Sequence, residues 1–477
     1  MNRHPLRLPL FLTLLAGLLA PPHLVGAIVA DRPESRPIAE RSLQARDEDE
    51  EEEDENDEED EEEGADEDED DDDDVNGGSG GDDDDDDDDL DEACDEVDDD
   101  DDGQEDRFCA DQAIVGLEPG ASIANINDES DTETIATIDG RAIHLLDLRV
   151  ARGQEEAKIA ELERTDGVAW AELNFVESSP ESRPSRFFPN TGSLAERSDT
   201  GVSYGLEQIG ADRIACVDGR GVVVAVIDTG VDLNHPDLRS RLAPGWNAFT
   251  GRHGGANDAV VGSSAGHGTH VAGIVLQTAP RAKVLPIKAL DGKGAGQAFV
   301  LARAIFYAID KDVEVINLSL GAADNSVVVA ESIDEAVEAQ TVVVASAGNS
   351  GRAAPVEYPV VLAGVIGVTA TDQRDRLPGF ASTNGSVDLA APGLRIASTF
   401  PVRSNLPSRH AIWSGTSMAA PWVAGTVALL LDKKPAMTLD QVTERLLATA
   451  EPLPTADTGG GRLDARAAVG CGKRGRR

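Results

Sequence analysis

The stretch Val222-Val223-Val224-Ala225-Val226-Ile227 decides the fold class, because six consecutive apolar residues without polar alternation are typical of a strand buried on both faces. It ends on Asp228-Thr229-Gly230. Similar runs alternate with helical patterns, so the sequence predicts a three-layer α/β domain whose mostly parallel, buried sheet is covered by helices on both sides. The other expected strands are residues 283–290, 313–318, 341–347 and 361–369, and the expected helices are residues 268–277, 297–310, 326–339 and 417–431.

Most of the negative charge lies in one tract. The 477 residues carry 91 Asp or Glu against 41 Lys or Arg, and residues 47–106 hold 44 of these acids with no basic residue. A chain with a net charge of −50 is repelled by phosphates, which weighs against nucleic-acid binding and attraction to anionic membranes. We expect residues 28–106 to be a disordered region whose polyacidic tract is a solvating spacer, with loose calcium collection as the alternative.

Residues 1–27 have the pattern of a signal peptide. Arg3 and Arg7 precede an apolar stretch, residues 8–20, and Val25-Gly26-Ala27 suits signal-peptidase cleavage. The stretch is short for a membrane span, which weighs against the alternative of an uncleaved anchor. We therefore expect export, to a periplasm or outside the cell. Export would permit disulfides, with Cys94–Cys109 and Cys216–Cys471 as candidate pairs, whereas no CxxC spacing suggests a metal site.

Two further regions precede the α/β domain. Residues 107–178 predict a small α+β unit, because strand-like stretches surround one helical pattern at residues 155–162. Residues 179–203, rich in Pro, Ser and Arg, predict an exposed linker with a maturation site. Residues 204–472 would then form the α/β domain.

Three polar segments in the α/β domain carry candidate chemistry. They are Ala225-Val226-Ile227-Asp228-Thr229-Gly230, Gly266-His267-Gly268-Thr269-His270 and Ser414-Gly415-Thr416-Ser417-Met418. Alone, each has an ordinary explanation as a turn carboxylate, a packed imidazole or a helix N-cap. Together they give the order Asp, His, Ser of one type of serine protease. A Ser hydroxyl becomes a good nucleophile when a neighbouring base takes its proton, and that base needs a carboxylate to fix its tautomer.

On these motifs, residues 204–469 resemble the subtilisin family of serine proteases. The resemblance implies that Ser417 is the nucleophile, His267 the general base and Asp228 the carboxylate that orients the imidazole. Ala345-Ser346-Ala347-Gly348-Asn349-Ser350-Gly351 is similar to a fourth family motif and implies that Asn349 donates to the oxyanion, together with the Ser417 backbone N–H.

The resemblance also implies that catalysis needs no cofactor. Many relatives carry a calcium-binding loop where this chain passes directly from Ile274-Val275-Leu276-Gln277 to Ala279-Pro280. No metal ligand is therefore assigned, although Asp237 resembles one ligand of that site, and a structural calcium is not placed.

The family's substrate groove implies two strand edges, formed here by Gly294-Ala295-Gly296 and Ser319-Leu320-Gly321, that would hold an extended polypeptide. Matching Tyr358-Pro359 to the family's Tyr-Pro places Glu357 where a Gly commonly floors the primary pocket. A buried carboxylate there would favour Arg or Lys at the cleaved bond, whereas the alternative is a solvent-facing loop Glu. Self-cleavage by such a pocket would fit three arginines of the linker, Arg183, Arg186 and Arg197.

Residues 107–178 resemble the subtilase propeptide in position, in length and in the final strand at residues 168–176. This implies a folding template and temporary inhibitor whose last strand and linker occupy the groove until cut; a permanent accessory domain is the alternative. We expect a monomeric, exported serine endopeptidase that acts on proteins or peptides and is made as a self-processing zymogen. The rivals are an inactive subtilase used as a binding module and a polyacidic calcium-binding protein. An α/β-hydrolase esterase is excluded, because Gly415-Thr416-Ser417-Met418-Ala419 is not GxSxG.

Overall fold

The computed structural model describes residues 96–98, 107–181, 196–198, 201–259, 261–322, 325–352, 357–383, 385–402, 409–454 and 458–471. The predicted signal peptide and almost all of the predicted disordered region lie outside the described residues, as do Arg183 and Arg186 of the predicted linker.

The larger domain is built on an eight-stranded sheet with the strand order β15-β14-β13-β12-β7-β10-β8-β9. Every neighbouring pair is parallel except β8 with β9. All five strands expected from apolar runs belong to this sheet, so the prediction of a mostly parallel α/β sheet is confirmed. The strands are β7 (Val223–Asp228), β8 (Trp246–Asn247), β9 (Arg252–His253), β10 (Lys283–Lys288), β12 (Val315–Leu318), β13 (Val342–Ser346), β14 (Val365–Thr371) and β15 (Leu389–Pro392).

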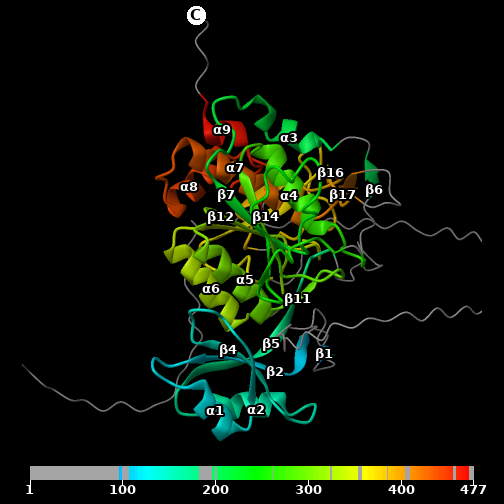
Figure 1. The fold of residues 1–477 in the computed structure, drawn as a ribbon. Coiled ribbons are helices and arrows are strands. Elements are labelled where there is room, and N and C mark those ends of the chain that lie inside the picture. The colour runs from blue at the N-terminus through cyan, green and yellow to red at the C-terminus, as the bar shows by residue number, and fades with distance from the viewer. Residues whose placement is uncertain are drawn as a thin grey trace, which may run out of the picture. The chain divides into compact units, whose positions relative to one another are not determined.

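Both faces of this sheet are buried, because side chains of a strand point alternately to opposite sides. In β7, Val224 and Val226 pack into one apolar cluster with α4 and α7. Ala225 and Ile227 pack into a second cluster with α5 and α6. Figure 1 shows these two pairs of helices on opposite sides of the strands. Because β7 is buried on both faces, every residue along it before Asp228 must be apolar, which explains the uninterrupted apolar run.

Capping residues define the starts of several helices. Ser326 Oγ accepts the Val329 N–H at the start of α6, and α8 has a capping box made by Thr438 and Gln441. The helix expected from residue 417 begins at Ala420 instead, after a 3-10 turn, with Pro421 in its first turn. No helix among the described residues is long and apolar enough to cross a membrane. The helical elements are α3 (Tyr204–Gln208), η1 (Ala211–Arg213), α4 (His267–Thr278), α5 (Ala298–Asp310), α6 (Val327–Glu338), η2 (Thr416–Met418), α7 (Ala420–Lys433), α8 (Leu439–Thr449) and α9 (Ala465–Val469).

The N-terminal α+β unit is an antiparallel sheet with two helices on one face. Its strand order is β5-β2-β4-β3, with β1 paired to β2. Ala113 and Val115 of β2 pack against the helices, whereas the intervening Ile114 faces the cluster that contains α5 and α6. The elements are β1 (Glu96–Asp98), β2 (Arg107–Leu117), α1 (Ile123–Ser130), β3 (Glu133–Thr137), β4 (Ile143–Asp147), α2 (Glu155–Leu162) and β5 (Val168–Ser178).

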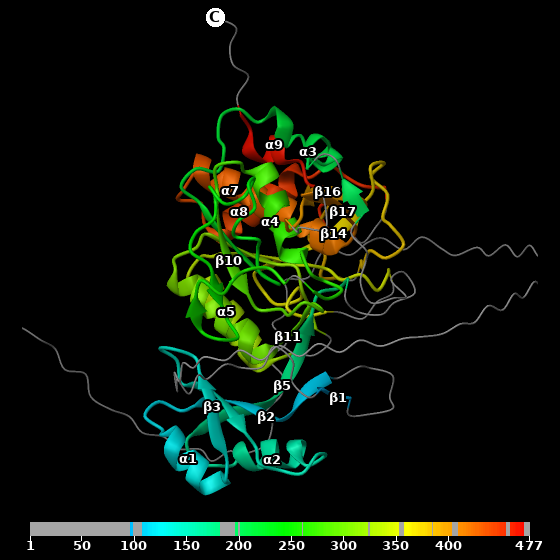
Figure 2. The same cartoon turned by 45° about the vertical axis from the view of Figure 1, so that its right-hand side comes forward.

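The end of β5 extends onto the larger domain. It pairs antiparallel with β11 (Ala295–Gln297), a strand outside the central sheet, and Figure 2 shows β5 running from the small sheet to β11. A separate three-stranded sheet joins β6 (Glu196–Ser198), β17 (His410–Trp413) and β16 (Ile396–Thr399). Arg197 of the predicted linker therefore lies in a strand, opposite Ala411. Cys216 and Cys471 form a disulfide, and Cys109 is also disulfide-bonded.

Candidate active site

Three elements bring the predicted triad together. Asp228 is the last residue of β7, His267 is the first residue of α4, and Ser417 lies in η2 immediately before α7. His267 Nδ1 hydrogen-bonds Asp228 Oδ1 at 2.7 Å, and all three side chains are fully buried. Gly268 makes this approach possible, because a Cβ at that position would lie 3.0 Å from the Asp228 Cβ.

A carboxylate from the start of the linker contacts three functional groups of the predicted site. Glu181 Oε2 accepts a hydrogen bond from Ser417 Oγ at 2.7 Å and lies 3.2 Å from His267 Nε2. Glu181 Oε1 accepts the Asn349 amide N–H at 2.8 Å. Only 1% of Glu181 is exposed, and no local pattern in the sequence distinguishes it from the rest of the linker.

The charges of these groups depend on one another. Burial disfavours the imidazolium, but the carboxylates of Asp228 and Glu181 outweigh it and raise the pKa of His267 to about 10. Burial likewise disfavours the Glu181 carboxylate, yet the His267 hydrogen bond and charge, with the donors Ser417 and Asn349, hold the pKa of Glu181 below its usual value. The contact between His267 and Glu181 therefore favours the imidazolium together with the Glu181 carboxylate.

The residues before Glu181 lie in the predicted groove. We call residues 176–181 the groove segment. Ser178 exchanges backbone hydrogen bonds with Gly321, at 3.0 and 2.8 Å, and Ser179 N–H donates to Gly294 O at 2.8 Å. Residues 176–178 pair with β11. The linker was expected to be exposed, but its first residues, Ser179 to Glu181, are buried because they follow this strand pairing into the site.

Comparison with known proteins agrees with this geometry. Residues 219–472, just over half of the chain, match the subtilase family. Thermitase from Thermoactinomyces vulgaris is 39% identical over 238 residues, which cover 48% of this chain and 81% of thermitase. The chain belongs to the subtilase family. It is a subtilisin-like serine endopeptidase.

Two further relatives extend the comparison of this subtilase. Subtilisin E from Bacillus subtilis is 37% identical over 281 residues, which cover 56% of this chain and 71% of subtilisin E. The crystal structure of fervidolysin from Fervidobacterium pennivorans, a keratinolytic enzyme related to subtilisin, superimposes with a TM-score of 0.64 at 28% identity. That match covers 77% of this chain and 61% of the fervidolysin chain, and it supports the subtilisin-like α/β fold.

Asp258 is a second residue of this subtilase that the motifs did not reveal. It is buried between the Asp228 loop and the start of α4, where Oδ1 accepts from Thr229 Oγ1 at 2.8 Å and from Gly266 N–H at 3.1 Å. Its other oxygen accepts the N–H and hydroxyl of Thr269. Burial raises the pKa of Asp258 to about 6 against these hydrogen bonds. Asp258 thus ties the loop after Asp228 to the helix that begins at His267.

Glu357, the predicted floor of the primary pocket, is buried. It is 5% exposed, which contradicts the alternative of a solvent-facing loop Glu. A Cβ on Gly321 would lie 2.9 Å from Glu357 Oε2, and a Cβ on Gly348 would collide with Oε1. The carboxylate therefore lies between the groove edge at Gly321 and the residue before Asn349.

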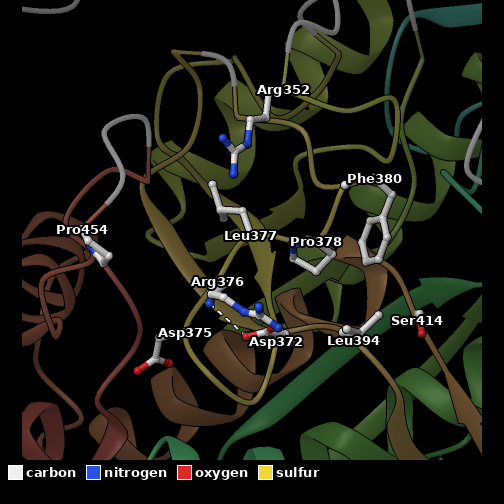
Figure 3. A pocket seen from close by; sticks show the side chains of 11 residues that line it. Arg352, Asp372, Asp375, Arg376, Leu377, Pro378, Phe380, Leu394, Ser414 and Pro454 are labelled. Carbon is white, nitrogen blue, oxygen red and sulfur yellow. Dashed lines mark hydrogen bonds and ion pairs between the residues drawn. The ribbon is translucent and has the colours of Figure 1, made fainter. Parts of the chain in front are cut away.

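The cavity drawn in Figure 3 borders the site only through Ser414, three residues before the predicted nucleophile. Its volume is about 710 Å³, and no triad residue lines it. Its acidic side chains are paired, Asp372 with Arg376 and Asp375 with Arg462. The two predicted groove edges are instead paired with the groove segment.

The residue expected to resemble a calcium ligand has a different partner. Asp237 Oδ2 lies 3.0 Å from His410 Nε2. Within the described part of the chain, no group of three or more His, Cys, Asp or Glu is arranged to hold a metal ion.

Proposed function

We propose that this subtilase is exported, that Asp228, His267 and Ser417 are its catalytic triad, and that it is made as a zymogen which cuts itself. It would act on extended polypeptides with a basic residue at the cleaved bond. The observation that carries the proposal is the course of the groove segment, which pairs with β11 and Gly321 and ends against Ser417.

The mechanism follows from the same contacts once the groove holds a substrate. Ser417 Oγ attacks the scissile carbonyl carbon while its proton passes to His267 Nε2. Asp228 holds the Nδ1–H, which fixes the tautomer and stabilises the imidazolium. The oxyanion is held by the Asn349 amide and the Ser417 backbone N–H. His267 then protonates the leaving amine, and water releases the acyl group by the same steps.

A propeptide role for residues 107–181 is supported by their contacts with α5 and α6. Glu172 of β5 accepts from Ser326 Oγ and from the Val327 and Val328 N–H groups, so it covers the otherwise unpaired donors at the start of α6. Asn174 Oδ1 accepts the Phe299 N–H in the first turn of α5 at 3.2 Å.

Salt bridges at the opposite ends of these helices add to the same docking. Arg141 bonds both Asp310, at the end of α5, and Glu335 in α6. A permanent accessory domain could make these outer contacts, but it would have no reason to send its last residues through the groove to Ser417.

Export is supported by the pattern of residues 1–27 and by the disulfide between Cys216 and Cys471, because such bonds persist in oxidising compartments. We propose a monomeric protein, with protein or peptide substrates and its own propeptide as partners, and with no membrane or nucleic-acid partner. Catalysis needs no cofactor in this proposal, and a structural calcium remains unassigned.

Specificity for basic residues is proposed from Glu357. A carboxylate beside both the groove edge and Asn349 would pair with the cation of an Arg or Lys side chain. A neutral side chain would leave that charge without this partner, so the preference comes as much from penalising other residues as from attracting basic ones.

The experiment that tests the function compares the purified protein with its Ser417→Ala variant by intact mass. We expect the wild type alone to shorten to about the size of residues 204–472 and to hydrolyse an arginyl peptide substrate. If both proteins stay full length and no peptide is cut, the binding-module alternative is favoured. If both shorten alike, another protease makes the cut, and self-processing is wrong.

A further inference from the structure

Glu181 is placed as an inhibitor rather than as part of the catalytic machinery. One of its oxygens is shared by the nucleophile Ser417 and the base His267, at 2.7 and 3.2 Å. The other oxygen takes the Asn349 N–H at 2.8 Å, the donor assigned to the oxyanion. Propeptides block a groove by lying in it, but here a side chain binds the reacting groups themselves.

We propose that the side-chain carboxylate of Glu181 inhibits the catalytic activity of the uncut chain. It lies where the oxyanion of the reaction would form and pairs with the imidazolium of His267. This inference rests on the proposed function, since it takes the triad and Asn349 to be the catalytic groups. It assigns to the site a ligand class, a carboxylate anion presented from the chain's own propeptide.

The charges around the contact explain why it would inhibit. A fully buried carboxylate is stable only when donors and a cation compensate it, and Ser417, Asn349 and His267 supply these. An imidazolium that keeps its proton cannot accept one from Ser417. Glu181 would therefore remove the base as well as cover the nucleophile.

Among the charged groups around His267, only Glu181 would be removed when the propeptide leaves. Asp228 faces it from the end of β7, and Asp258 lies behind Asp228 through Thr229. His270, one turn further along α4, is neutral, because burial and the neighbouring His267 lower its pKa to about 3. Both aspartates belong to the larger domain, so only Glu181 leaves with the propeptide.

The fit of Glu181 depends on the backbone beside it. A Cβ on Gly415 would collide with Glu181 Oε1, so the carboxylate lies directly against the turn that carries Ser417. No bond of the chain can be presented to Ser417 while this carboxylate occupies the oxyanion position. Self-cutting would therefore require Glu181 to withdraw first.

The first test measures the protonation of His267 without requiring any catalysis. In the uncut Ser417→Ala chain, histidine ring nitrogens labelled with ¹⁵N would be titrated by NMR. We expect a pKa of His267 near 10 with Glu181 present. With Glu181→Gln we expect the protonation constant to fall at least about tenfold, because the charge partner is gone while the side-chain shape is kept. Glu177→Gln is the matched control, since Glu177 is equally buried in the groove segment and should leave the titration unchanged.

The second test treats chains that retain Ser417 with an organophosphofluoridate. Intact mass measures the rate at which the uncut protein becomes labelled. The reagent forms a P–O bond with Ser417 Oγ and releases fluoride, while His267 takes the hydroxyl proton. We expect Glu181→Gln to be labelled about tenfold faster or more than the wild type and Glu177→Gln. Equal labelling of all three chains, or an unchanged His267 titration, would overturn the inhibitory role. A shifted titration with no labelling of any chain would uphold the carboxylate contact and reject the proposed triad chemistry.

Discussion

Among single residues, Asn349 is held by hydrogen bonds to its amide oxygen, which leave its amide N–H group facing the site. Its Oδ1 accepts the Thr416 N–H and the Thr416 hydroxyl, each at 3.0 Å. These bonds identify the oxygen end and turn the Nδ2–H group toward the site, where it meets Glu181. The donor is therefore aligned before any substrate binds, which is the condition for strong oxyanion stabilisation.

Replacing Asn349 with Ala should lower kcat about 10²–10³-fold with little change in KM, the size of the loss known for the same donor in subtilisin itself. The effect falls on kcat because the lost bond forms chiefly in the transition state. Steady-state kinetics on a peptide substrate checks it. Thr416→Val, which loses only the hydroxyl bond to Asn349 Oδ1, is the control and should lose much less activity. An equal loss in both variants would mean that the turn, and not the donor, matters.

Glu357→Gln should reduce the preference for basic residues. We expect the ratio of kcat/KM for an arginyl over a phenylalanyl peptide to fall about 10–100-fold, since a buried charge-assisted pair is replaced by a neutral contact. The ratio cancels general effects on folding or catalysis. Glu331→Gln, which removes an exposed acid of α6 that is bonded to Trp170, should leave the ratio unchanged. If the wild-type enzyme cuts both peptides equally well, the proposed specificity role of Glu357 is wrong.

At the scale of elements, the start of α6 depends on a carboxylate from another part of the chain. Burial raises the pKa of Glu172 to about 7, although the N–H groups of Val328 and Val327 and the hydroxyl of Ser326 oppose the rise. The docked side chain therefore keeps its proton at a pH where the exposed side chain has lost it. The contribution of Glu172 to docking should therefore be largest below a pH of about 4.5.

Stability of the uncut Ser417→Ala chain should accordingly fall as the pH rises from about 4.5 to 7. The contribution of Glu172 is about 3 kcal/mol across this window, because the folded pKa lies above the unfolded one. Denaturant unfolding of this chain and of the same chain with Glu172→Gln, from pH 4.5 to 7.5, isolates the residue from other titrating groups such as Asp258. Parallel curves for the two chains would contradict the prediction.

At the scale of the whole molecule, the disulfide joins the two ends of the larger domain. Cys216 and Cys471 are 255 residues apart in sequence, with Cα atoms at 5.8 Å. Cys471 follows α9, whose Ala468 and Val469 pack into the same cluster as α4 and α7. The bond therefore links the last helix to the segment that enters the central sheet.

The Cys216→Ser/Cys471→Ser double variant should lose about 2–5 kcal/mol of unfolding free energy, because the unfolded chain regains the freedom of a very long loop. Denaturant unfolding in the absence of reductant measures this loss and leaves the Cys109 bond intact. Peptide hydrolysis at moderate temperature should be almost unchanged, since Cys216 lies beside the C-terminal ends of α4 and α7, whereas His267 and Ser417 lie at their N-terminal ends. A variant as stable as the wild type would show that packing of α9 alone closes the domain.

Local sequence patterns predicted the central sheet and placed the candidate triad. Strands β7, β10, β12, β13 and β14 were predictable because burial on both faces demands apolar runs that leave a strong local signal. Asp228, His267, Ser417 and Asn349 were predictable because each lies in a short motif with glycine or other small neighbours. By contrast, α1 was not predicted, since Ile123–Ser130 is rich in polar residues and is held by packing of Ile126.

The neighbours of these groups could not be predicted from the sequence and are seen only in the folded chain. Glu181 and Asp258 carry no local pattern, because their importance comes from contacts with residues 8 to 236 positions away. The burial of residues 179–181 likewise depends on antiparallel pairing with β11 and Gly321, whereas their composition alone predicted an exposed linker. A sequence motif identifies functional residues that lie in one short turn. The charge of the site, and the side chains that fill it, depend on residues that folding brings from distant parts of the chain.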